Sequence, residues 1–149
     1  MIASSSMSVI GSSPAPSLPF AKTLALPYQP PLPLAALLAF LGTRAVKGVE
    51  AIHDGVYWRT LRLPHGNAIV ALGPPQGEGD ARVACRLWLA DAQDEAAAVE
   101  RCRHLLDLDA NPDVINAHLG GDPLLGPYVR RTPGLRVPGA VDGAELAVR

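Results

Sequence analysis

Three arginines that lie close together in the sequence are the residues best suited to contact nucleic acid. Arg130, Arg131 and Arg136 stand in a stretch that contains several proline and glycine residues. Guanidinium groups bind phosphate oxygens through paired N–H donors. No aromatic residue lies between these arginines, and an exposed, solvated surface is the commoner role of such a cluster. The sequence therefore offers them as candidate contacts to a DNA backbone, with a solvated surface as the favoured alternative.

The histidines, cysteines and glycines lack the spacings of metal and cofactor sites. No two of the four histidines are spaced as i and i+4, and Cys85 and Cys102 form no C-x-x-C motif. The glycines between positions 73 and 79 do not follow the spacing of a dinucleotide-binding loop. The serines among residues 4–18 have no base placed nearby that could activate them. We predict no metal and no cofactor.

Composition argues against several classes of protein. The net charge of −1 gives no global basic field. The apolar run from Leu32 to Leu41 is far shorter than the ~20 residues of a membrane span, and residues 1–21 lack the basic residue that opens a signal peptide. Two cysteines without paired spacing fit a reducing compartment. We therefore expect a cytoplasmic protein that has no membrane partner.

The first part of the chain predicts an unstructured leader followed by a strand and a helix. Residues 1–22 are rich in serine and proline and show no periodicity, which favours a disordered leader. Residues 23–28 form a short β-type run. Leucines then recur at helical spacing from Leu34 to Leu41, and Gly48 ends that helix.

Residues 49–89 change to the period of two that is typical of strands. Asp54-Gly55 is a tight-hairpin signal, and Tyr57 and Trp58 fall on opposite faces of one strand, although the sequence does not decide which side chain packs under the helices. Residues 94–107 return to helical spacing. The order β-α-β-β-β-α predicts an α+β fold with helices on one face of an antiparallel sheet.

After Leu108 the sequence predicts helices alone. Asn111 and Asp122 each precede a proline, as a helix N-cap does, and Asp142 with Glu145 forms a D-x-x-E capping box. No glycine, asparagine or proline ends that last helix before Arg149. We expect the first helices of a second, all-α module that continues in a longer protein.

Several ordered motifs resemble those of one enzyme family. They are Tyr28-Gln29-Pro30-Pro31, Ala36 to Leu41, Arg44-Ala45-Val46, Gly48-Val49-Glu50, Leu106 to Asp109, and Arg131 to Gly139 followed by Asp142 and Glu145. Together they cover about residues 23–149. The chain resembles the N-terminal region of bacterial 3-methyladenine DNA glycosylase II, the AlkA type.

The resemblance implies an architecture and an activity. Residues 1–22 would be a leader, residues 23–108 a TATA-box-binding-protein-like α+β domain, and residues 109–149 the start of a helix-hairpin-helix glycosylase domain. That family flips an alkylated base out of damaged double-stranded DNA and hydrolyses its glycosidic bond with the help of one Asp. The matching Asp lies beyond Arg149, so we expect no catalytic residue here. The DNA partner would be met through the missing domain, with nucleoid association at most.

Phe40 and Arg44 are the pocket residues that the resemblance carries over. Phe40 matches an aromatic residue that the family's N-terminal helix contributes to the base-binding cleft. Arg44 lies four residues on, hence on the same helix face, and matches an arginine close to that cleft. The alternatives are core packing for Phe40 and, for Arg44, a solvated helix end that the helix dipole favours.

Two further functions stay open on the sequence. A non-catalytic module would bind DNA or a protein through an exposed sheet face or the basic segment. A small-ligand binder would use the cleft beside Phe40.

Overall fold

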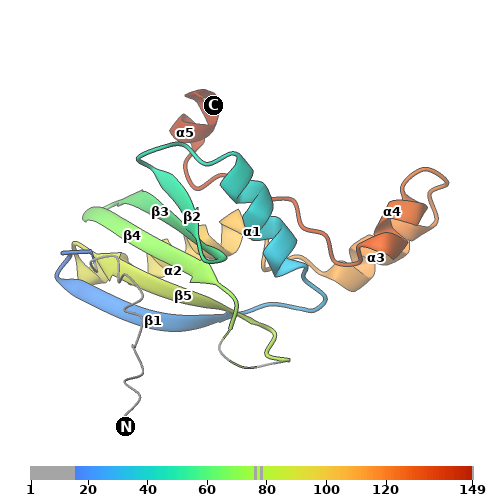
Figure 1. Cartoon of the computed structure of the whole chain (residues 1–149), viewed down its shortest axis with the longest axis horizontal. Coiled ribbons are helices and arrows are strands. Elements are labelled where there is room, and N and C mark those ends of the chain that lie inside the picture. Colours follow the sequence, from blue (N-terminus) through green and yellow to red (C-terminus); the bar gives the residue numbers. More distant parts are fainter. Residues whose placement is uncertain (1–15, 76, 78, 149) are drawn as a thin grey trace, which may run out of the picture.

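The alternating segments form an antiparallel sheet of five strands in the order β1-β5-β4-β3-β2 (Figure 1). The computed structural model describes residues 16–75, 77 and 79–148. The strands are β1 (Phe20–Pro27), β2 (Glu50–His53), β3 (Val56–Leu63), β4 (Gly66–Gly73) and β5 (Arg82–Leu89). The helices are α1 (Leu34–Thr43), a 3₁₀ turn (Ala92–Asp94), α2 (Glu95–Leu105), α3 (Pro112–Gly120), α4 (Gly126–Arg131) and α5 (Gly143–Val148).

One face of the sheet carries the hydrophobic core. Alternate residues of the strands point inward and pack against the apolar faces of α1 and α2. The core includes Tyr57, Val70, Leu72, Val83, Leu87, Leu37, Leu38, Ala98 and Leu105. In the view of Figure 1, α2 lies behind the sheet. The α+β prediction is confirmed, and the structure decides that Tyr57 faces the helices while Trp58 faces outward.

The Asp54-Gly55 hairpin is confirmed. Both residues have positive φ angles, 50° and 74°, as a two-residue type I′ turn requires. The turn joins β3 to β2, which pairs with β3 alone at the edge of the sheet. The predicted order was one strand short, because the four residues of β2 are too few to show a clear alternation.

β1 begins three residues earlier than predicted. It pairs with β5 along its whole length, from Phe20 opposite Leu89 to Pro27 opposite Arg82. Long-range pairing therefore recruits Phe20, Ala21 and Lys22, which local composition assigned to the leader. Residues 1–15 of that predicted leader lie outside the described residues.

α3 and α4 form a helical hairpin that projects away from the sheet (Figure 1). The Asn111 side chain accepts hydrogen bonds from the amides of Asp113 and Val114, at 3.0 and 3.2 Å. Asp122 accepts from the amides of the two leucines that precede α4, at 2.8 and 2.9 Å. The predicted cap at Asn111 is confirmed, whereas the one at Asp122 is wrong in position, because α4 begins at Gly126 with Leu125 as its N-cap and Asp122 holds the turn before it.

Residues 132–142, here called the connector, return from the helical hairpin to the α+β body. Gly134 has a φ of +74°, and a side chain there would collide with the carbonyl oxygen of Pro31. Further along, the Gly139 amide donates to the Leu105 carbonyl oxygen at 3.1 Å, and Val141 joins the core. The segment after residue 108 is thus held to the α+β body at its far end as well as at its start.

Candidate functional site

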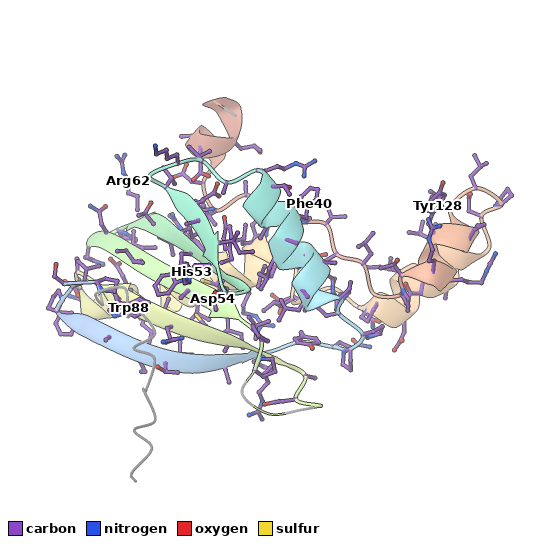
Figure 2. The ribbon with its side chains drawn as sticks, viewed as in Figure 1. Phe40, His53, Asp54, Arg62, Trp88 and Tyr128 are labelled. Carbon is purple, nitrogen blue, oxygen red and sulfur yellow. The ribbon has the colours of Figure 1, made fainter. Side chains whose placement is uncertain are left out.

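Phe40 and Arg44 lie together at the exposed end of α1. Leu34, Leu37 and Leu38 hold the opposite side of the helix in the core, so Phe40 turns outward and is 43 % exposed. The Arg44 guanidinium lies over the Phe40 ring, 3.8 Å from its centroid, a cation–π contact. Figure 2 shows the position of Phe40 on α1. The two residues predicted for a pocket are therefore in contact, and Phe40 is not simply packed in the core.

A cleft of about 440 Å³ opens beside this pair. Its walls come from α1, β2, β3, the connector and α5. The lining includes Phe40, Arg44, Glu50, Arg59, Glu145 and connector residues 138–141. The cleft exists because the connector crosses back over the α+β body and places α5 opposite α1.

A buried ion-pair network forms the inner wall of the cleft. Arg59 is 4 % exposed; its Nη1 donates to Glu50 Oε1 at 3.2 Å and its Nη2 to Glu145 Oε2 at 2.7 Å. The Tyr57 hydroxyl also donates to Glu50 Oε1, at 2.6 Å. A buried charge requires such partners, because desolvation without them is costly. Arg59 thereby fixes α5 against the sheet.

This network is not predicted by the sequence motifs described above, although one signal for it is present. Arg59 shares the inward register of β3 with Tyr57 and Leu61, and a charged residue on an apolar face needs a buried partner. Glu50 stands opposite Arg59 across the Asp54-Gly55 hairpin, so that half of the network follows from the turn. Glu145 is 86 positions from Arg59, and no local pattern joins them.

The predicted capping box is confirmed in its first half. Asp142 Oδ1 accepts from the amides of Ala144 and Glu145, at 2.7 and 3.4 Å. These amides lower the pKa of Asp142 below its usual range, so the cap stays charged near neutral pH. The Glu145 carboxylate faces Arg59, a contact that a capping box does not predict.

The cleft is better suited to binding a flat ring than to acid–base chemistry. It presents the Phe40 ring, one face of which is covered by the Arg44 guanidinium, while the carboxylates of Glu50 and Glu145 are engaged by Arg59. In the part of the chain that the structure describes, no group of three or more His, Cys, Asp or Glu side chains is placed to hold a metal ion. Among the described helices, none is long and apolar enough to cross a membrane.

The three candidate phosphate contacts do not form one cluster. Arg130 and Arg131 are exposed on α4, and the Arg131 guanidinium lies 5.0 Å from the Tyr128 ring centroid. Figure 2 places Tyr128 on the projecting hairpin. Arg136 is 4 % exposed, and its Nη1 and Nη2 donate to the carbonyl oxygens of Ala110 and Gln29 at 2.8 and 2.7 Å. Arg136 is therefore a buried structural residue, which corrects the prediction of a phosphate contact there.

Comparison with known proteins gives consistent similarities. A family model described as "AlkA N-terminal domain" matches residues 23–142. The chain is 46 % identical over 127 residues to a "Probable bifunctional transcriptional activator/DNA repair enzyme AlkA" from Mycobacterium tuberculosis (strain H37Rv), covering 85 % of this chain and 25 % of that relative. It is 34 % identical over 124 residues to "DNA-3-methyladenine glycosylase 2" from Escherichia coli (strain K12), covering 83 % and 41 %.

A solved structure shares the fold. The chain matches a "3-methyladenine dna-glycosylase from Archaeoglobus fulgidus" with a TM-score of 0.55 and 17 % identity, over 74 % of this chain and 35 % of that one. The chain thus spans 25 % to 41 % of the length of the curated relatives named above. The family match also runs past residue 108, through the connector to its last residue.

Proposed function

Because this chain belongs to the AlkA N-terminal domain family, we propose that it serves as the N-terminal domain of a base-excision-repair glycosylase that removes alkylated bases from DNA. The observation that carries the proposal is the outward-facing Phe40, covered by Arg44 at the mouth of a cleft. Its proposed partner is damaged double-stranded DNA, bound mainly through a further domain. Its proposed location is the cytoplasm, with nucleoid association at most.

Phe40 supplies one wall of a pocket for the extruded base. A purine methylated at a ring nitrogen is cationic and planar, so it gains from stacking on an aromatic face. The base has to leave the duplex before any side chain can reach its faces. The Arg59 network holds α5 and the connector opposite Phe40, and so sets the width of the cleft.

The Phe40 wall of the cleft is not sufficient for catalysis. Hydrolysis of the glycosidic bond needs a group that stabilises the developing sugar cation and a second surface that orients the base. The carboxylates at this cleft are engaged by a buried arginine. We therefore propose that the chain by itself binds an alkylated base weakly and does not excise it.

A chimera with the Mycobacterium tuberculosis relative tests this role. Residues 20–142 of this chain replace the matching part of that protein, and release of labelled base from methylated DNA is measured. Phe40→Ala should lower kcat/KM roughly five- to 150-fold, because stacking on an aromatic ring contributes about 1–3 kcal/mol per base. Phe20→Ala is the matched control, since Phe20 is 46 % exposed against 43 % for Phe40. Equal activity of the two variants would show that Phe40 does not contact the base.

A non-catalytic interaction module is the second candidate. The projecting hairpin favours it, because Arg130 and Arg131 are both exposed on α4 and can contact phosphates or an acidic partner. The apolar side chains of the same hairpin, Leu124 at 78 % and Tyr128 at 62 % exposed, instead fit a domain whose partner surface is uncovered. Size-exclusion chromatography of the isolated chain separates the two readings. A stable monomer favours a free-standing module, whereas concentration-dependent association that Leu124→Ser reduces favours a domain whose partner surface is uncovered.

A further inference from the structure

The outward face of the sheet carries a stacked tryptophan pair. Trp58 on β3 and Trp88 on β5 have ring centroids 5.4 Å apart and planes 20° apart. Between them lies β4, where Ala71 stands opposite Trp58. Its small side chain leaves room for the two rings to meet above it. Both tryptophans are half-buried, and neither belongs to the hydrophobic core.

A hollow of about 610 Å³ lies on the same face, and its lining includes Ala71, the cross-strand partner of Trp58, and Arg86. Its floor is made of small residues, Ala25, Ala71, Gly73 and Ala84, which come from three strands. Their registers place them in neighbouring rows on the outward side of the sheet. These small side chains make the hollow a trough, which is open to planar groups that stack on the neighbouring tryptophan rings.

Two arginines of β5 line the trough. Arg86 lies two residues from Trp88, on the same face, and is exposed. Arg82 stands four residues further back; its Nε lies 3.5 Å from Asp80 Oδ1 in an exposed ion pair, which contributes little and is easily exchanged for another anion. The trough thus carries cationic groups on its central strand, β5, and lies beside the aromatic pair.

We propose that this sheet face binds a single-stranded segment of nucleic acid, with unpaired bases stacked on Trp58 and Trp88 and phosphates beside Arg86 and Arg82. An open sheet with aromatic residues and flanking cations suits unpaired bases, whose faces are accessible only outside a duplex. An apolar or proline-rich peptide would use the rings but leave the arginines without a counter-charge. Charge complementarity therefore favours a nucleic acid over a peptide at this face.

This site is distinct from the cleft at Phe40. Phe40 belongs to α1, which packs against the inward face of the sheet, whereas the tryptophan pair lies on the outward face. Figure 2 shows Phe40 and Trp88 at separate places on the molecule. Binding here goes beyond the proposed function, and its failure would leave the base pocket unaffected.

Intrinsic fluorescence tests the proposal directly, because the chain has two tryptophans in all and both belong to the stacked pair. The full chain is titrated with a short oligothymidylate, with excitation at the red edge of the tryptophan band. We expect saturable quenching. Anisotropy of the labelled oligonucleotide should show binding that Trp88→Ala weakens roughly five- to 150-fold, while Trp58→Phe retains most of it.

Salt and charge variants supply the second readout. With two arginines at phosphates, the log–log dependence of the binding constant on salt should have a slope of about −1.4. Arg86→Ala should weaken binding and make that slope shallower, while Lys47→Ala, at an exposed position beyond the end of α1, should change neither. Circular dichroism of each variant checks that it is folded.

Three results would overturn the proposal. The first is an absence of quenching by the oligonucleotide. The second is equal quenching by a duplex of the same length, which would show that unpaired bases are not what the face recognises. The third is quenching by a peptide of residues 12–19 where the oligonucleotide gives none, which would make this a peptide-binding face.

Discussion

At the scale of single residues, two buried arginines organise this molecule. Arg59 lies in the inward register of β3 and joins Glu50 to Glu145. Arg136 lies in the connector and binds two main-chain carbonyl oxygens from distant segments. Both side chains are 4 % exposed. Because a planar guanidinium donates in fixed directions, each arginine sets the relative position of the segments that it joins.

Arg136→Ala should destabilise the fold by about 2–4 kcal/mol, because it leaves the carbonyl oxygens of Ala110 and Gln29 without their donors in a buried place. Urea unfolding measures the change. Arg131→Ala, which alters an exposed arginine of α4, should stay within about 0.5 kcal/mol of the parent chain. If the Arg136 variant kept normal stability but bound DNA more weakly, Arg136 would be a phosphate contact after all.

His65 should make stability depend on pH. Its Nδ1 lies 2.9 Å from Asp94 Oδ1, and this hydrogen bond raises the pKa of His65 above its usual value of 6.5. A raised folded-state pKa contributes stability that is fully present below about pH 6.5 and is lost as the pH rises through the folded-state value. Unfolding midpoints in urea should therefore fall from pH 6 to pH 9.

His65→Gln should remove that part of the pH dependence, whereas His118→Gln, at an exposed position on α3, should preserve it. If the His65 variant kept the full decline in midpoint, another titrating group would be responsible.

At the scale of elements, the connector and the segment before α1 form one unit. Gly134 packs on Pro31, and Arg136 binds the carbonyl oxygen of Gln29. These residues belong to two of the motifs by which the family was first indicated. The two motifs contact each other in space, although residues 29 and 136 are 107 positions apart.

Gly134→Ala tests this contact. The residue has a φ of +74°, and a methyl group would meet the Pro31 carbonyl oxygen, so we expect a loss of at least about 2 kcal/mol in the free energy of unfolding. Gly120→Ala is the control, since a methyl group there meets nothing within 4 Å. Two variants of equal stability would mean that the connector does not pack on this segment.

Patterns in neighbouring residues predict most of the helices and strands, but they do not predict the contacts between distant segments. The turn at Asp54-Gly55 and the cap at Asn111 depend only on adjacent residues, so the sequence alone predicts them. The contact of Arg59 with Glu145, the partners of Arg136 and the first residues of β1 depend on segments that meet only in the folded chain. For the candidate site, the family resemblance indicated Phe40 and Arg44, and their helical spacing placed them on one helix face, while the ion-pair wall behind them was missed.

At the scale of the whole molecule, the chain has two candidate binding surfaces with different chemistry. The helix side offers a cleft with one aromatic wall, and the sheet side offers a stacked tryptophan pair beside arginines. Among the described residues, the carboxylates that line these two surfaces are Glu50, Glu145 and Asp80, and each is held in an ion pair. A developing sugar cation would need a carboxylate that is clear of such pairs. We therefore propose recognition, and not bond cleavage, as the role of this chain.

The most direct test is release of labelled 3-methyladenine from methylated DNA by the purified chain, with the Escherichia coli relative as the positive control. We predict no release above background, because Glu50 and Glu145, the carboxylates at the cleft, are both held by Arg59. Turnover that disappears on Glu145→Gln or Glu50→Gln would contradict the account, because it would make a carboxylate of this chain the catalyst.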